Sequence, residues 1–158
     1  MLGLCSMWTN AAAADVDQLF QQARSQALQL RRDSATLESF TRSRMSWQSH
    51  NAQVSTITTH VNDLGQTLSQ LQAARDSAGK ASQQAIDRIQ PILQELASNT
   101  TSIIEHLNQN PNRLRDPTYR EYLRANADLA STLAEQTSNI VAFADAQRRF
   151  EEAQAKLG

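Results

Sequence analysis

Apolar residues recur every three or four positions along almost the whole chain, which is the period of an amphipathic helix. Four stripes follow one another. The first contains Val16, Phe20, Ala23, Ala27, Leu30, Leu37 and Phe40, and the second contains Trp47, His50, Val54, Ile57, Val61, Leu64, Leu68 and Leu71. The third contains Ile86, Ile89, Leu93, Leu96, Thr100, Ile103 and Leu107, and the looser fourth contains Tyr119, Tyr122, Leu123, Leu129, Leu133, Ile140, Phe143, Phe150 and Leu157. The pattern predicts four helices.

Residues that start and stop helices fall between the stripes. Asp15 is placed to cap the first helix, and Asp116–Pro117 combines an N-cap with proline at the first helical position. Gly79 follows the second stripe and is expected to take the left-handed conformation of a C-cap. The segment 108–111 (NQNP) ends the third helix, and Pro91 inside that helix is expected to kink or break it.

The boundary between the first two helices is the hardest to place. A single helix over residues 15–76 would exceed the usual length of globular helices, and the stripe shifts in phase between Leu37 and Phe40. We place the turn at residues 41–46 (TRSRMS), with residues 31–34 (RRDS) as the alternative. Four helices of broadly similar length then follow one another through short connections. This organisation predicts an all-α, up-down-up-down antiparallel four-helix bundle.

The first residues, 1–14 (MLGLCSMWTNAAAA), precede the amphipathic pattern. Ala12–Ala14 have the small-residue character of a signal-peptidase site, although a basic n-region is missing and the apolar part is short. We therefore expect residues 1–14 to be a disordered tail or a signal-peptide remnant, and residues 15–158 to form a single helical-bundle domain. We favour export to the periplasm or the cell exterior, with a cytoplasmic location as the alternative.

The composition narrows the possible functions. Fifteen Lys and Arg nearly balance 16 Asp and Glu, which argues against a nucleic-acid binder. The only cysteine, Cys5, cannot form an internal disulfide, and no stretch is apolar enough to span a bilayer. Phosphate-loop, G-x-S-x-G and H-E-x-x-H motifs are absent. We therefore predict a non-enzymatic protein without a cofactor, which acts through an unknown protein partner, through self-association or in a structural role.

Aromatic residues and a histidine gather at one predicted end of the bundle. The starts of the second and fourth helices lie at the same end, so Trp47, His50, Tyr119 and Tyr122 are expected to converge there. His50 falls on an apolar stripe, and a buried histidine needs a hydrogen-bond partner. This end is the best candidate for a small-ligand or metal-binding function, the alternative to interaction. Packing of amphipathic aromatics at the end of a core explains the same pattern, and we favour that explanation.

The remaining histidines and the arginines give weaker signals. His60 shares a helix face with Asp63, and His106 adjoins Glu105, but neither forms the Glu-x-x-His pattern of metal sites in bundles. We interpret both histidines as surface or boundary residues and predict no metal ligands and no catalytic residues. An arginine-rich first helix could bind an acidic partner or phosphate, but neighbouring acidic residues favour a solvated face with local ion pairs. These arginines are Arg24, Arg31, Arg32, Arg42 and Arg44.

Four short segments resemble those of an exported bacterial helical family with no assigned activity. They are residues 38–41 (ESFT), 46–50 (SWQSH), 84–89 (QAIDRI) and 106–108 (HLN). The resemblance covers most of the chain after Asp15. It implies a helical bundle and export, and it transfers no functional residue.

Overall fold

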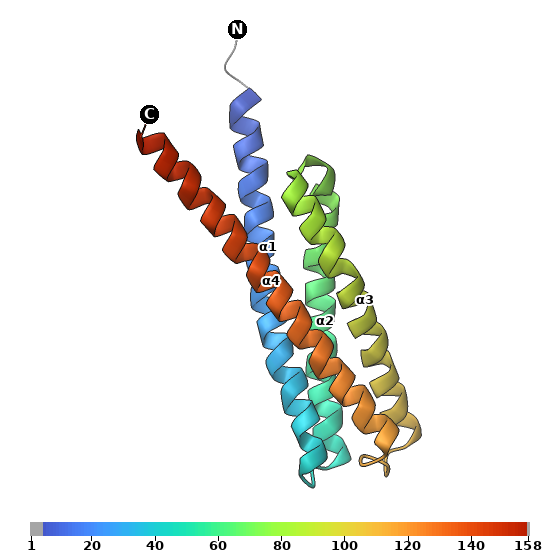
Figure 1. Ribbon diagram of the computed structural model, residues 1–158. Coiled ribbons are helices and arrows are strands. Elements are labelled where there is room, and N and C mark those ends of the chain that lie inside the picture. Colours follow the sequence, from blue (N-terminus) through green and yellow to red (C-terminus); the bar gives the residue numbers. More distant parts are fainter. Residues whose placement is uncertain (1–4, 158) are drawn as a thin grey trace.

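The computed structural model describes residues 5–157 and consists of four long helices in this part of the chain (Figure 1). Successive helices run in opposite directions, and α1 and α3 each pack against both α2 and α4. The predicted up-down-up-down antiparallel four-helix bundle is therefore confirmed. The elements are α1 (Cys5–Ser39), a 3-10 turn η1 (Phe40–Arg42), α2 (Trp47–Ala74), a 3-10 turn η2 (Arg75–Ser77), α3 (Lys80–Gln109) and α4 (Pro117–Leu157).

The predicted stripes of the first three helices form the core. Nearly all of their members are buried, including Phe20 in α1, Leu71 in α2 and Leu96 in α3. The fourth helix differs from the prediction. Its buried face contains small and polar residues as well as large apolar ones: Tyr119, Leu123, Asn126, Ala130, Leu133, Ala134, Thr137 and Val141. Most of these residues are too small or too polar for hydropathy to identify them as core residues. The apolar stripe predicted for the fourth helix was therefore partly wrong.

Two of the predicted helix boundaries are confirmed. The chain turns after Ser39 and re-enters a helix at Trp47, where the hydroxyl of Ser46 accepts a hydrogen bond from the Ser49 backbone N–H at 3.2 Å. The alternative turn at residues 31–34 is wrong, because this segment lies inside α1. At the start of α4, the Asp116 carboxylate accepts a hydrogen bond from the Thr118 N–H at 2.9 Å, as an N-cap does.

The first helix begins earlier than expected. It starts at Cys5, so Asp15 lies within α1 and does not cap it. Alanine has the highest helix propensity, which favours the helical conformation at residues 11–14. Residues 1–4 lie outside the described part of the chain. Their interpretation, together with residues 5–14, as a signal-peptide remnant stays a prediction.

The C-cap expected at Gly79 after the second helix was wrong. Gly79 has a φ of −63° and a ψ of 158°, so it is the extended N-cap of α3 and not a left-handed C-cap. The chain instead leaves α2 through η2, whose end is held by the Ala78 N–H donating to the Arg75 carbonyl at 3.1 Å. Helix α3 continues through Pro91 without a break, and the alternative expectation of a kink at this residue stays a prediction.

The helices are also less equal than expected. Helix α4 contains 41 residues, whereas α2 contains 28. Val141 is the last buried residue of α4, and from there the helix extends past the α2–α3 connection and diverges from α1 (Figure 1). We call residues 142–157 the α4 arm. None of the helices described over residues 5–157 has the length and hydropathy that a membrane crossing requires.

Candidate functional site

The first candidate site lies at the end of the bundle where α2 and α4 begin. His50 and Tyr119 are 1% and 0% exposed, and the Nδ1 atom of His50 lies 3.0 Å from the Tyr119 hydroxyl. The predicted meeting of these two residues is therefore observed. The N-caps at Ser46 and Asp116 place His50 and Tyr119 within the first turn of their helices, on faces that point into the core.

The hydrogen bond between these side chains favours one tautomer of the His50 imidazole. Burial lowers the pKa of His50 and raises the pKa of Tyr119, so both groups are neutral near pH 7. Because the Tyr119 hydroxyl has no other hydrogen-bond partner among the described residues, we assign it as the donor and Nδ1 of His50 as the acceptor. In this assignment the proton of the neutral imidazole is on Nε2, which acts as a hydrogen-bond donor.

Further rings surround this pair. The His106 ring stacks on Tyr119 with 4.8 Å between centroids and 16° between planes, and it meets Tyr122 edge-on at 6.4 Å. Phe40 packs edge-on against His50 at 5.3 Å. The sequence did not reveal His106 as a member of this cluster, because we interpreted it only as a surface or boundary residue. Its position in the last turn of α3, next to the start of α4, was the signal that could have revealed it.

Trp47 lies at the same end of the bundle and contacts the end of α3. Its indole N–H donates to the Leu107 carbonyl at 3.0 Å and so ties the start of α2 to the end of α3. Trp47 thus lies at the predicted end of the bundle, but the ring contacts of the cluster join His50, Tyr119, His106, Tyr122 and Phe40. A ligand-binding role for Trp47, His50, Tyr119 and Tyr122 stays a prediction.

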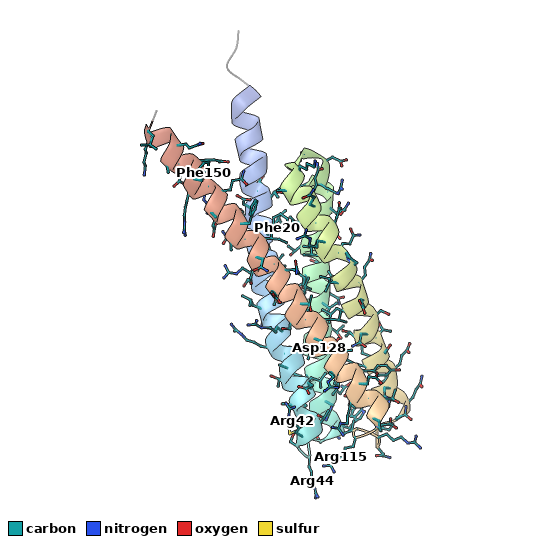
Figure 2. The ribbon with its side chains drawn as sticks, in the orientation of Figure 1. Phe20, Arg42, Arg44, Arg115, Asp128 and Phe150 are labelled. Atoms are coloured by element: carbon teal, nitrogen blue, oxygen red, sulfur yellow. The ribbon has the colours of Figure 1, made fainter. Side chains whose placement is uncertain are left out.

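A cavity of about 620 Å³ opens next to the cluster, between the α1–α2 and α3–α4 connections. His50 and Phe40 line its inner side. Arg44, Arg113 and Arg115 line it from the connections, and Arg44 and Arg115 extend from the same end of the molecule in Figure 2. The volume lies in the range of small-molecule sites. The remaining lining residues are Ser43, Met45, Asn112, Leu114 and Asp116.

His60, the third histidine, links two helices. His60 Nδ1 lies 2.7 Å from a carboxylate oxygen of Asp33 and links α2 to α1, so its partner is not the Asp63 of its own helix. Within the described residues, no group of three or more His, Cys, Asp or Glu side chains is arranged to hold a metal ion. Among the arginines of the first helix, Arg42 pairs with Glu38 at 3.3 Å and is largely exposed, in agreement with a solvated face.

A polar layer crosses the bundle above the aromatic cluster. The amide of Asn126, which is 1% exposed, donates to the Ser34 hydroxyl at 3.1 Å. Its carbonyl oxygen accepts from the Thr100 hydroxyl at 3.1 Å and from the Asn99 amide at 3.2 Å. Asn126 therefore joins α1, α3 and α4 through one side chain. All buried polar side-chain atoms among the described residues have partners, so this layer is structural.

The second candidate site is the α4 arm, at the opposite end of the molecule. Phe143, Phe150 and Leu157 are 61%, 63% and 89% exposed, and Figure 2 labels Phe150 on this arm. A cleft of about 950 Å³ lies where α4 diverges from α1 and α3. Its lining carries both charge signs, from Asp17, Lys80 and Arg148 among others, and it includes Phe143. Sequence reasoning assigned the three large apolar residues of the arm to the core, which was wrong.

The tyrosine hydroxyl of the cluster gives a test of its energetics. We expect Tyr119→Phe to lower the free energy of unfolding by about 1–2 kcal/mol, because the buried His50 Nδ1 loses its only partner. Tyr122→Phe is the matched control, since no hydrogen bond involves the Tyr122 hydroxyl among the described residues, and should change stability by less than about 0.5 kcal/mol. Urea unfolding of both variants measures the difference. Equal effects would contradict the assigned hydrogen bond.

The lowered pKa of His50 predicts how stability depends on pH. The unfolded chain binds a proton at His50 near the ordinary value of 6.5, whereas the folded chain binds it only at lower pH. The contribution of neutral His50 to the free energy of unfolding is therefore complete above about pH 6.5. It is lost as the pH falls below this value toward the pKa of the folded state. We expect the wild type to lose more stability than His50→Gln between about pH 7.5 and about pH 5. Parallel urea titrations that give the same pH dependence for both proteins would contradict this expectation.

Comparison with protein-family models, curated proteins and solved structures finds no match for this chain. The resemblance to an exported helical family therefore stays a prediction.

Proposed function

We propose that the protein is a non-enzymatic interaction bundle whose interface is the α4 arm, and that the arm binds a second copy of the chain. The observation that carries this proposal is the exposure of Phe143, Phe150 and Leu157 on a helix that extends beyond the bundle. Exposed apolar patches of this kind mark interaction surfaces. The core of the bundle does not need these side chains, because the buried face of α4 ends at Val141.

The three large residues form one stripe that faces away from the core. They are spaced by seven residues, or nearly two helical turns, so they lie almost in line along the arm. Phe143 follows the buried Val141 by a rotation of about 200° around the helix axis, which places it on the opposite face. Phe150 and Leu157 therefore face solvent, whereas the exposed Phe143 also borders the cleft that α4 forms with α1 and α3.

The composition of this stripe favours a second copy as the partner. The exposed Ala146 and Ala153 alternate with the large residues at the three- and four-residue spacing of a coiled-coil seam. In an antiparallel pair of arms the large positions of one copy face the alanines of the other, so large and small side chains interdigitate. Such an interface is isologous and closes as a twofold dimer.

The charges of the arm are compatible with this pairing. The positions that flank the stripe most closely include Gln147 and Gln154, which carry no charge. Arg149 and Lys156 flank the other side of the stripe, and Arg148 is paired with Asp145 of its own helix at 2.5 Å. The stripe itself is uncharged, as is typical of the centre of an interface, and the two basic side chains lie at its rim. The stripe is short, so a weak dimer is expected.

Hydrogen–deuterium exchange at low and high protein concentration tests this proposal. We expect the amides of residues 142–157 to exchange more slowly at high concentration, because an isolated helical arm opens readily and a paired one does not. The rest of the bundle should exchange equally at both concentrations. Exchange in the arm that is independent of concentration would contradict self-association, and protection confined to another surface would contradict the assignment of the interface.

A matched pair of variants adds a control to the exchange experiment. Phe150→Glu should abolish the concentration dependence by placing a charge in the stripe. Ala155→Glu introduces the same charge on the same exposed arm, about 140° around the helix from Phe150. This control should retain the concentration dependence. A loss in both variants would indicate a general charge effect and would contradict a stripe-specific interface.

We also propose that the protein is exported, on the basis of the small residues at Ala12–Ala14. Cell fractionation followed by mass spectrometry of the intact chain tests this location. A chain in the envelope fraction that begins near Asp15 is the expected result. A chain retaining Met1 and found only in the cytoplasm would contradict export.

A further inference from the structure

We propose that the cavity between the α1–α2 and α3–α4 connections binds a small organic anion, a carboxylate or phosphate attached to an apolar body. The guanidinium groups of Arg44, Arg113 and Arg115 and the Nε2–H of His50 recognise the charged group. This site lies at the opposite end of the bundle from the α4 arm, and its occupancy is independent of the function proposed above.

The first observation is an unused donor on a buried side chain. His50 is 1% exposed, and its Nδ1 is bonded to Tyr119. No hydrogen bond involves its Nε2 among the described residues. Every fully buried polar side-chain atom in this part of the chain has a partner, so Nε2 is not fully buried. The small exposed part of His50 is therefore assigned to Nε2, which reaches the cavity that this residue lines. A donor held in this position by Tyr119 and Phe40 is already oriented for a ligand.

The second observation is the charge around the cavity. Three of its ten lining residues are arginines, and Asp116 is the only acidic one. The Asp116 carboxylate already accepts the Thr118 N–H as the cap of α4. The ion pairs of the described residues do not include Arg44, Arg113 or Arg115. The cavity thus carries excess positive charge, although the whole chain has a formal charge of −1. Arginine is the residue best suited to binding carboxylate and phosphate groups.

The loop that carries two of these arginines is held in place by hydrogen bonds. The Arg113 N–H donates to the Asn110 carbonyl at 2.9 Å, and the Asp116 N–H donates to the Arg113 carbonyl at 3.2 Å. The Nε2 atom of His106, whose ring stacks on Tyr119, donates to the same Arg113 carbonyl at 3.3 Å. The backbone of the loop is therefore anchored to the aromatic cluster, which reduces the entropy that ligand binding would cost.

The apolar part of the lining specifies the rest of the ligand. Phe40, Met45 and Leu114 line the cavity beside the arginines. An inorganic ion would leave these side chains in water, whereas an organic anion buries them while its charged group meets His50 and the arginines. The combination of one charged edge and one apolar edge favours a molecule such as an aromatic or aliphatic acid.

Titration of the wild type with phenyl phosphate and with benzoate tests this site, with the imidazole signals of His50 followed by NMR. We expect saturable shifts of the His50 ring signals with at least one probe, and the tighter probe identifies the charged group of the ligand. Benzyl alcohol, which lacks the charge, should leave these signals unchanged. Binding that moves no His50 signal, or equal shifts with benzyl alcohol, would overturn the proposal.

Arginine variants separate this site from general surface charge. The double variant Arg113→Gln/Arg115→Gln should weaken binding by about tenfold or more, because two charge-assisted contacts are lost. Arg120→Gln removes one exposed charge from α4 just beyond the cavity and should weaken binding by less than about twofold. An unchanged affinity in the double variant, or an equal loss in Arg120→Gln, would overturn the assignment. The variants change exposed side chains only, so folding is retained and is checked by circular dichroism.

Discussion

Phe150→Glu is expected to weaken self-association by about tenfold or more, because central aromatic anchors dominate interface energetics. Phe150 is 63% exposed at the middle of the stripe formed by Phe143, Phe150 and Leu157. In an antiparallel dimer the substitution places two carboxylates in the interface, where each loses hydration without gaining a partner. Light scattering after size-exclusion chromatography over a range of loading concentrations measures the effect.

The stability of the monomer provides the internal control for this variant. Because Phe150 is 63% exposed, Phe150→Glu should change the free energy of unfolding of the monomer by less than about 0.5 kcal/mol. Ala155→Glu should match the wild type in both measurements. A Phe150→Glu variant whose mass and concentration dependence equal those of the wild type would contradict the role of the stripe.

Asn126→Ala is expected to lower the free energy of unfolding by about 2–3 kcal/mol, the largest effect on stability that we expect of a polar residue. Its side chain joins three helices, and truncation removes its bonds to Ser34, Thr100 and Asn99 and leaves a cavity. The Ser34 hydroxyl, which is 1% exposed, then loses its only bond to another helix. Chemical denaturation measures the loss.

Asn139→Ala is the matched control for the polar layer. It makes the same substitution in the same helix at an exposed position, so its effect should remain below about 0.5 kcal/mol. If both variants are equally stable, the polar layer contributes little, and small-residue packing alone would have to explain the buried face of α4.

The polar layer also shows where the prediction of the fold succeeded and failed. The buried faces of α1 to α3 were predicted almost completely because large apolar side chains such as Leu30, Ile57 and Ile103 occupy them. In α4, small residues such as Ala130 and Ala134 occupy much of that face, and hydropathy cannot distinguish them from exposed alanines. Phe143, Phe150 and Leu157 were then predicted to be core residues because of their helical spacing, although the buried face of α4 ends at Val141.

The candidate site was predictable only in part, for a related physical reason. His50 and Tyr119 could be placed together because capping residues fix the starts of two helices and the topology brings those starts to one end. The arginines of the cavity could not be found in this way. Arg113 and Arg115 lie in a connection whose course depends on hydrogen bonds between backbone groups, and Arg44 was grouped with the solvated arginines of the first helix. No local motif marks their convergence.

Sedimentation equilibrium of the wild-type chain from about 1 to about 200 μM tests the central claim, self-association through the α4 arm, most directly. The account predicts a reversible increase from the chain mass of 17.6 kDa toward twice that mass as concentration rises. A single species of 17.6 kDa at every concentration would contradict self-association and leave the apolar arm as a surface for a different protein.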